Sequence, residues 1–440
     1  MTIVVTSRIQ HRRGLRSDLP DQLSEGELGW CLDTRQLFIG NSDGFGDNTE
    51  IITQFSQEVL SNVNVLATNT TVARSLADRF ADVYNLRDFG AAGDGSDATA
   101  ALQLAINTAG SYSTIFAPPG IYGLNSVSLI DGIEIQGAGS TSTIFRSNTN
   151  NTVMFSYASG NTTGFGITLR NLQLDTLDTV GCTGIQLNGG NTSVRVQDIR
   201  LQNLNIFGDL QTAINLSCAV NSMISDVFIS QALEGVVLQT CADVDLRDVK
   251  VQNGTGAGFH VLGDAVANSL FDQGIRLTSC STTGQNRGLV IQDHERGTAQ
   301  GCSFTDAVNG ACVIENSSNW KFSSCEFETN SNVNAAVSTD SSSWRISWTN
   351  SQFSLGSVGL WLQGNTYSVT NSLFFGNEQP DIYLEAQKST IGNNMLQSTA
   401  NINSVWETLT ANCNIISANI TSGNIFVVGP ATVSANNVIC

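Results

Sequence analysis

Short apolar segments recur through most of the chain at intervals of about two dozen residues. Each segment begins on a small or turn-forming residue, after which apolar and variable residues alternate. The nine segments are Gly184–Leu187, Ala213–Leu216, Gly235–Leu238, Gly258–Val261, Gly288–Ile291, Ala311–Ile314, Ala335–Ser338, Gly359–Leu362 and Asp381–Leu384. Their first residues lie 29, 22, 23, 30, 23, 24, 24 and 22 positions apart. Repeats of this length are typical of a solenoid in which each repeat forms one rung.

One rung cannot bury its apolar residues, but stacked rungs can, because each strand then has parallel partners about 4.8 Å above and below. The pattern therefore predicts an all-β parallel β-helix. Strand alternation directs one set of side chains inward: Ile185, Ile214, Val236, Phe259, Leu289, Cys312 and Leu360. The same alternation directs a second set outward: Gln186, Asn215, Val237, His260, Val290, Val313, Trp361 and Tyr383.

The first 82 residues follow a different pattern. Residues 1–55 contain two short alternating runs, Glu25–Leu32 and Gln36–Asn41, on either side of a polar turn, which predicts a β-hairpin in a small N-terminal β domain. Residues 56–82 are polar with scattered apolar residues. Val72, Leu76 and Phe80 lie four positions apart there, so a short helix and a helical neck are expected.

The β-helix is expected to span residues 83–400. Near its start, Ala98–Ala109 predicts a short helix that Asp97 can cap and that would cover the edges of the first rung. The two long intervals predict loop insertions near Leu204–Gln211 and Asp264–Gln285. The period is lost after residue 400, and residues 401–440 are expected to form a C-terminal β cap.

Three stretches resemble known families. Asp88–Asp97 together with Pro118–Tyr122 resembles the entry motif of the pectate-lyase-like right-handed β-helix superfamily. Ser7–Asn41 resembles the virion-attachment module of bacteriophage tailspikes and tail fibres. The resemblance implies a right-handed β-helix and makes Asp94 and Asp97 turn and cap residues rather than catalytic ones.

The resemblance also implies how the protein works. Such proteins are usually homotrimers in the virion tail, made in the host cytoplasm, and they bind and often cleave bacterial surface polysaccharide, either lipopolysaccharide O-antigen or capsule. Residues 1–55 would dock onto phage tail, adaptor or baseplate proteins.

Composition narrows the possible partners. Charged residues are only 13% of the chain, yet 41% are hydrophobic, so a large core can form. The net charge of −18 makes nucleic acid a poor partner. No apolar run reaches membrane-spanning length, so no membrane insertion is expected. The ten cysteines include no Cys-x-x-Cys pair, and the three histidines are scattered, so neither a metal nor a cofactor is expected. Cys218 and Cys241, one rung apart, are expected to stack as small core residues.

Acidic residues are sparse on the rungs, so one cluster is notable. It comprises Asp264, Asp293, Glu295 and Glu315, just after the outward strand positions of three consecutive rungs. Glycoside cleavage needs two carboxyl groups. Neighbouring rungs would place them roughly 5 Å apart, near the retaining geometry, and two rungs about 9–10 Å apart, at the upper edge of the inverting range. The alternative is that these are solvated turn acids.

Aromatic residues form a second group. Trp361 and Tyr383 are expected to stack outward, where flat rings suit sugar faces or a subunit interface. Trp320, Trp344 and Tyr367 have rung-like spacings and are expected to share a column, in the core, at a subunit interface or, for Trp344, against sugar. His260 points outward as a further sugar-binding candidate, with a solvated or interface histidine as the alternative.

Three functions remain open from the sequence. The first is a tailspike that depolymerises polysaccharide as a glycoside hydrolase, with a polysaccharide lyase as second choice because Arg276, Arg287 and Arg296 lie near the acids. The second is a receptor-binding fibre on the same scaffold without catalysis. The third is a structural baseplate or tail component.

Overall fold

The computed structural model describes residues 11–41, 48–55, 63–160, 163–176, 179–191, 193–264, 273–330, 334–397 and 403–439. It divides into two compact units, Met1–Val83 and Tyr84–Cys440.

The first unit contains a four-stranded sheet of β1 (Arg12–Gly14), β2 (Leu28–Cys31), β3 (Leu37–Ile39) and β4 (Thr49–Ile51), with a 3-10 turn at Arg16–Asp18. β2 and β3 form the expected antiparallel hairpin, in which Leu28 lies opposite Ile39. Beneath the sheet, Leu23, Cys31 and Phe38 form a small buried cluster.

A second hairpin follows, made of β5 (Asn64–Leu66) and β6 (Ala73–Ser75), and it leads into helix α2 (Leu76–Phe80). The helix expected here is only five residues long. It begins at Leu76 because residues 73–75 pair with β5, and the Ser75 side chain caps it by accepting a hydrogen bond from the Asp78 backbone N–H at 3.1 Å. Phe80 remains exposed, so no apolar helix face is buried.

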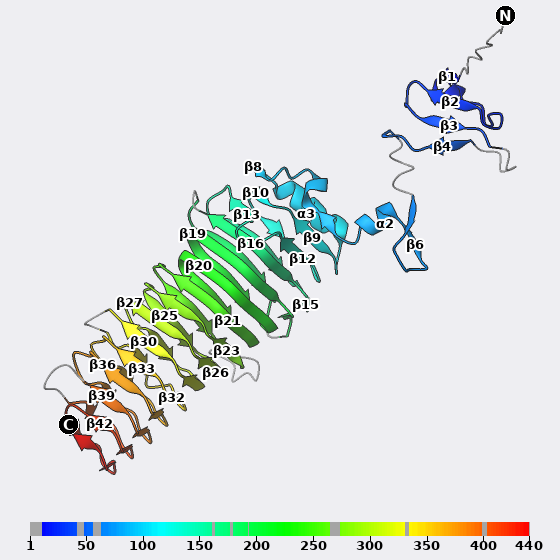
Figure 1. Ribbon diagram of the computed structural model, residues 1–440. Coiled ribbons are helices and arrows are strands. Elements are labelled where there is room, and N and C mark those ends of the chain that lie inside the picture. Colours follow the sequence, from blue (N-terminus) through cyan, green and yellow to red (C-terminus); the bar gives the residue numbers. More distant parts are fainter. Residues whose placement is uncertain are drawn as a thin grey trace, which may run out of the picture. The chain divides into compact units, whose positions relative to one another are not determined.

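The second unit is a parallel β-helix, as predicted (Figure 1). Its rungs stack into three sheets, here called faces A, B and C in the order in which each rung visits them. Four long strands run across corners between faces: β16 (Thr168–Thr176), β19 (Arg200–Ser217), β20 (Ala219–Gln239) and β21 (Ala242–Gln252).

The shorter strands belong to single faces. Face A contains β11 (Val127–Ser128), β14 (Val153–Ala158), β17 (Cys182–Asn188), β22 (Ala257–Leu262), β25 (Arg287–Gln292), β28 (Cys312–Glu315), β31 (Val337–Thr339), β34 (Leu360–Leu362), β37 (Ile382–Leu384), β40 (Val405–Glu407) and β43 (Ile425–Phe426). Face B contains β7 (Tyr84–Asn85), β9 (Thr114–Ala117), β12 (Glu134–Gly137), β23 (Ile275–Thr278), β26 (Glu295–Gln300), β29 (Ser318–Ser323), β32 (Ser347–Thr349), β35 (Ser368–Thr370), β38 (Thr390–Gly392), β41 (Ile415–Ser417) and β44 (Val433–Ala435). Face C contains β8 (Asp94–Asp97), β10 (Gly120–Leu124), β13 (Thr143–Ser147), β24 (Ser281–Thr283), β27 (Ser303–Ala307), β30 (Glu326–Thr329), β33 (Gln352–Ser354), β36 (Leu373–Phe375), β39 (Met395–Gln397), β42 (Ile420–Thr421) and β45 (Val438–Ile439). Two short strands, β15 (Gly164–Phe165) and β18 (Val196–Gln197), pair at the corner between faces A and B.

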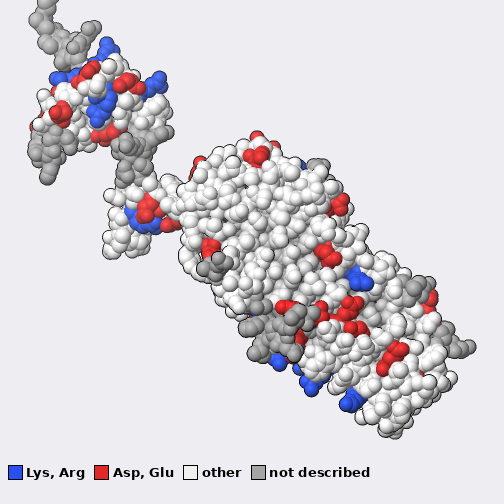
Figure 2. All heavy atoms as spheres, turned by 180° about the vertical axis from the view of Figure 1, so that it is seen from behind, with Lys and Arg blue, Asp and Glu red and all other residues white. Residues whose placement is uncertain are grey.

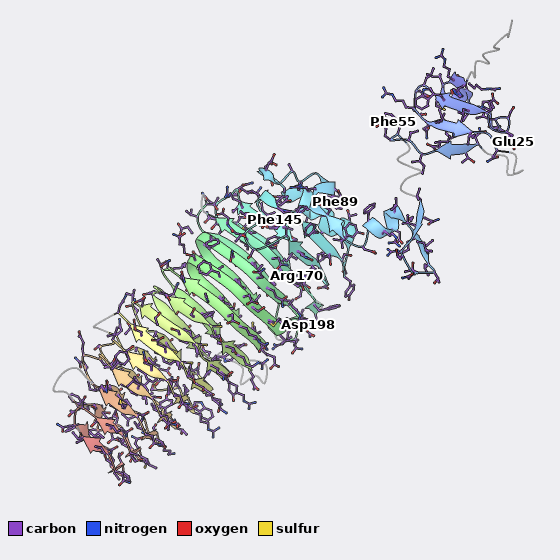
Figure 3. The ribbon with its side chains drawn as sticks, in the orientation of Figure 1. Glu25, Phe55, Phe89, Phe145, Arg170 and Asp198 are labelled. Atoms are coloured by element: carbon purple, nitrogen blue, oxygen red, sulfur yellow. The ribbon has the colours of Figure 1, made fainter. Side chains whose placement is uncertain are left out.

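Stacked side chains fill the interior. All seven inward residues expected from the alternation are buried. Aromatic residues continue the stacking on face C, where the ring centroids of Phe327 and Phe353 lie 5.2 Å apart and those of Phe353 and Phe374 lie 4.6 Å apart. Phe145, labelled in Figure 3, is fully buried between Tyr122 and Phe155. The core is therefore one continuous column along the solenoid.

The N-terminal end is covered by helix α3 (Thr99–Ala109), which buries Leu102, Ala105 and Ile106 (Figure 1). Asp97 Oδ1 accepts hydrogen bonds from the backbone N–H of Thr99 at 2.9 Å and from its hydroxyl at 2.6 Å. Asp94 accepts from Ser96 in the preceding turn. These contacts agree with the turn and cap roles that the family resemblance implied.

The C-terminal residues differ from the expected cap. Strands β40 to β45 continue all three faces, so the β-helix extends past residue 400 to Ile439. The last rung is shorter: Ile415 lies opposite Val433 after 18 positions, whereas the earlier segments recur after 22 or more. A search for the longer period therefore misses it.

The first insertion also lies elsewhere than expected. In one rung the chain takes 12 positions from Asn188 on face A to Arg200 on face B. The equivalent stretch of the next rung, from Ser217 to Met223, takes only 6. The extra residues are therefore near Gly189–Arg195. Leu204–Gln211, where the insertion was predicted, belongs to strand β19. The second insertion falls at the same corner, after Leu262, and its residues 265–272 lie outside the described residues.

Candidate functional site

The corner between faces A and B, around β25, β26, β28 and β29, brings together most of the predicted site residues. Gln292, the last residue of β25, lies opposite Glu315, the last residue of β28. Asp293 and His294 form the corner, and Glu295 begins β26. Asp264 is partly buried, two residues beyond the end of β22. The acids are therefore near one another along the corner, but each occupies a different register position instead of one column.

Amide side chains hold three of these four acids. Gln292 Nε2 donates to Glu315 Oε2, and Asn316 Nδ2 donates to Asp293 Oδ1 at 2.6 Å. Glu295 Oε1 accepts from Asn319 Nδ2 at 3.1 Å. Each amide belongs to a neighbouring rung or strand, so the stack itself fixes the orientation of the carboxylates.

His260 joins a polar chain across three rungs of face A. Its Nδ1 lies 3.4 Å from Glu234 Oε2, and its Nε2 lies 2.9 Å from Gln292 Oε1. Burial alone lowers the pKa of His260, but the hydrogen bonds with Glu234 and Gln292 and the charge of Glu234 together raise that pKa above its usual value. The chain continues from Gln292 to Glu315, so hydrogen bonds connect His260 to one of the predicted acids through Gln292.

The outward column of face A carries an aromatic ladder, defined as Trp361, Tyr383, Trp406 and Phe426. The pairing of Trp361 with Tyr383 was expected; Trp406 and Phe426 extend it because the β-helix continues beyond residue 400. The ring centroids are 5.8, 6.2 and 5.9 Å apart along the ladder. Trp361 and Trp406 are each 40% exposed.

A recess of about 290 Å³ adjoins this ladder and is lined in part by Trp361, Tyr383 and Gln379. The Trp361 indole N–H donates to Glu385 Oε2 at 3.2 Å, which holds the ring in place. Farther toward the N-terminus the column is apolar but covered, since Val290 and Val313 are buried although they point outward.

The column expected from Trp320, Trp344 and Tyr367 does not form. Trp344 lies opposite Ser318 and Asn365, two positions before the register of Trp320 and Tyr367. Trp320 and Tyr367 are buried in the core, whereas Trp344 is 37% exposed at the corner. Equal spacing along the chain failed here because the corner segments differ in length from rung to rung.

Sequence reasoning missed a second acidic group, on face C. It comprises Asp306 on β27 and Glu326 and Glu328 on β30, on adjacent rungs. Burial, followed by the negative charges of Asp306 and Glu326, raises the pKa of Glu328 above its usual value. Ser303 and Gln352 donate to Glu326 at 2.9 and 3.0 Å. The rung-like interval between Asp306 and Glu328 was available in the sequence as a signal.

A polar groove of about 740 Å³ runs from Glu326 along the corner between faces B and C. Its walls are rich in amide and hydroxyl groups, including those of Asn350, Gln352 and Asn371. It spans several rungs, so an extended polar chain can lie in it.

Three other predictions concern two core cysteines, metal binding and membrane-spanning segments. Cys218 and Cys241 are buried, as expected. Across the described ranges, no group of three or more His, Cys, Asp or Glu side chains is arranged to hold a metal ion. None of the helices in the described part of the chain is both long and apolar enough for a membrane span.

Comparison with known proteins identifies the β-helix. The family model described as rhamnogalacturonase A/epimerase, pectate lyase-like, matches residues 83–333, which is more than half of the chain. The chain belongs to this family. A second model, the major tropism determinant N-terminal domain, matches residues 9–41, the segment that contains the β2–β3 hairpin. A search of curated proteins finds no match.

Solved structures share this pectate lyase-like fold at low identity. Tailspike protein 3 of bacteriophage CBA120 aligns with a TM-score of 0.65 and 11% identity over 97% of this chain and 78% of that one. The A-module of the Azotobacter vinelandii mannuronan C-5 epimerase AlgE4 aligns with a TM-score of 0.59 and 16% identity over 80% of this chain and all of that one. Pre-mature gene product 12 of bacteriophage phi29 aligns with a TM-score of 0.53 and 12% identity over 80% and 56% of the two chains. The expected resemblance to tailspikes with this β-helix is confirmed.

Proposed function

We propose that this protein is a tailspike of a phage virion, attached through residues 1–55, whose β-helix binds and depolymerises bacterial surface polysaccharide. The N-terminal match to a tropism-determinant domain and the shared fold of the CBA120 tailspike support attachment to a tail. The resemblance further implies a homotrimer, which sedimentation of the purified protein would test.

The aromatic ladder carries the proposal of polysaccharide binding. Its rings repeat once per rung, are partly exposed and border a recess, so several sugar faces can stack along them in sequence. Glu385 and Gln363, which are hydrogen-bonded to each other at 2.6 Å, supply polar groups beside the rings. Neighbouring rings of the ladder are tilted to one another by 84°, 52° and 71°, so each ring offers a sugar its own apolar face or edge beside the polar groups that sugar hydroxyls need.

For cleavage we propose glycoside hydrolysis, with two carboxyl groups from adjacent rungs as acid and base or nucleophile. One candidate group is the predicted set Asp264, Asp293, Glu295 and Glu315. The other is the pair of Asp306 and Glu328, which the raised pKa of Glu328 favours because a general acid must hold its proton near neutral pH. Lyase chemistry is the second choice, with Arg276, Arg287 and Arg296 near the corner acids.

The test is incubation of the full-length protein with purified lipopolysaccharide and capsules, followed by analysis of released oligosaccharides. Hydrolysis yields new reducing ends without an unsaturated sugar, whereas elimination yields an unsaturated sugar that absorbs in the ultraviolet. Two double variants distinguish the acids: Asp293→Asn with Glu315→Gln, and Asp306→Asn with Glu328→Gln.

Loss of release in only one double variant assigns the site to that group of acids. Retention of full activity in both would reject both assignments. Binding without any release of oligosaccharides would reject the enzyme and leave the non-enzymatic receptor-binding fibre.

A further inference from the structure

Basic side chains form a stripe along face B and its corner with face A. We define the basic stripe by its five residues, Arg276, Arg296, Lys321, Arg345 and Lys388, all of which are exposed. Figure 2 shows blue groups following one another along one edge of the C-terminal half of the β-helix. Only six Lys and Arg residues follow position 250, so five of the six lie in this stripe.

Register explains the alignment of three of these residues. Backbone bridges pair Ser318, Trp344, Asn365 and Gln387 one after another along the corner. The residue that follows each of them therefore also stands in one column. That column is Arg296, Asn319, Arg345, Thr366 and Lys388, and all five have a positive φ between 54° and 67°. Cations therefore recur on every second rung, roughly 10 Å apart.

A pocket of about 380 Å³ lies at the N-terminal end of the stripe, across β23, β26 and β29. The described residues that line it include Arg276, Arg296 and Lys321 but no acidic side chain, and Asn319 adds an amide.

Hydrogen-bond capacity remains in this pocket. Arg276 pairs through Nε with Asp245 and through Nη1 with Asp243 at 3.4 Å. Arg296 donates from Nη1 to Gln273 at 2.8 Å, and its Nε lies 3.5 Å from Glu295 Oε1. Among the described residues, Lys321 has no ion-pair partner and neither arginine uses Nη2. A ligand with negatively charged oxygens can therefore accept from three cationic side chains at once.

The C-terminal part of the stripe has no nearby acids on its own face. The face B strands from β29 to β44 contain no Asp or Glu. Arg345 lies over the exposed ring of Trp344, with its guanidinium carbon 4.4 Å from the ring centroid. The chain as a whole has a net charge of −18, but these cations create a positive electrostatic potential around the stripe.

We propose that the basic stripe binds the acidic sugars of an anionic polysaccharide, with a sugar carboxylate seated in the pocket of Arg276, Arg296 and Lys321. This inference rests on the proposed function and specifies its substrate class. A polymer with an acid group on alternate sugars matches cations on alternate rungs, since one pyranose unit advances an extended chain by about one rung. Trp344 adds an apolar surface beside the cations, in agreement with its prediction as a sugar-binding residue.

The experiment measures binding of full-length protein to a panel of purified bacterial capsular polysaccharides and lipopolysaccharides, half with uronic acids and half neutral. Each acidic polymer is also tested after its carboxyl groups have been reduced to alcohols. We expect binding to an acidic polymer that carboxyl reduction weakens and that weakens as salt increases. The triple variant Lys321→Gln, Arg345→Gln and Lys388→Gln should lose roughly tenfold in affinity.

The matched control is Lys250→Gln, an exposed lysine on the face C part of β21, which should bind like the unmodified protein. Binding of neutral polymers only, equal binding after carboxyl reduction, or unchanged affinity in the triple variant would overturn the anionic ligand while the proposed function stands. If the folded protein binds no polymer of either kind, the proposed function itself fails.

Discussion

His294 should make the β-helix lose stability as the pH falls below the neutral range. Its side chain is 1% exposed at the corner between β25 and β26, and its ring packs against Trp320 with centroids 5.5 Å apart. Neither ring nitrogen has a hydrogen-bond partner in the described part of the chain. Burial therefore lowers the pKa of His294 to about 4 from its usual 6.5.

The sign and magnitude follow from linkage. The pKa is depressed in the folded state, so between pH 6.5 and about 4 the unfolded chain binds a proton that the folded protein excludes. At 1.36 kcal/mol per pKa unit, this difference lowers the free energy of unfolding by about 3 kcal/mol over that window and has no effect above it. His260 has the opposite sign: because its pKa is raised, it stabilises the folded state at low pH and loses that effect as the pH rises through its folded pKa.

The chain has only three histidines, which makes the measurement direct. Deuterium exchange at the histidine C2 position, followed by mass spectrometry across pH 3–9, gives a titration midpoint for each histidine-containing peptide. Denaturant unfolding at pH 7 and pH 4 then compares the protein with His294→Leu. The variant removes no hydrogen bond of the ring, so its loss of stability between pH 7 and pH 4 should be smaller by about 3 kcal/mol.

A matched control is His260→Gln, which should retain the acid sensitivity due to His294. The reasoning would be refuted if His294 titrated at or above pH 6.5. It would also be refuted if the unmodified protein and His294→Leu lost the same stability between pH 7 and pH 4.

Three further predictions concern binding, catalysis and the core. Trp361→Ala should weaken polysaccharide binding several-fold by calorimetry, whereas the exposed corner residue Leu409, changed to Ala, should not. In the unmodified protein, kcat should fall at alkaline pH as Glu328 loses its proton. Glu328→Gln should lower kcat with little change in KM and should abolish this alkaline fall. Phe353→Ala should cost about 3–5 kcal/mol of unfolding free energy in denaturant, whereas Phe426→Ala, at a partly exposed ring, should cost about 1 kcal/mol or less.

Much of the fold could be predicted from the sequence because burial imposes a regular pattern on strands. Alternate residues of a strand lie on opposite sides, so apolar residues at inward positions such as Ile185, Leu289 and Leu360 had to be buried once the rungs were recognised. The terminal helix was predictable for a similar reason, since its apolar face and the Asp97 cap are both local features.

The corners were not predictable to the same degree. A corner residue has no burial pattern, and a longer interval does not reveal which corner received the extra residues. The interval of 29 therefore led to an insertion at Leu204–Gln211, although the additional residues lie near Gly189–Arg195. Trp344 was assigned to the wrong column because the corner segments vary in length. For the same reason the alignment of Arg296, Arg345 and Lys388 could not be recognised from their spacing in the sequence.

Spacing along the stack alone cannot decide between the two acidic groups, because both contain acids on adjacent rungs, and rungs lie roughly 5 Å apart. Their surroundings can decide. Asp293 and Glu315 each accept a hydrogen bond from an amide on a neighbouring rung. Glu328 is partly buried beside two other carboxylates, which raises its pKa and holds it toward its protonated form. Since hydrolysis requires one carboxyl group with a proton to donate, face C is the better source of the general acid. The corner acids would then act in binding, beside the basic stripe.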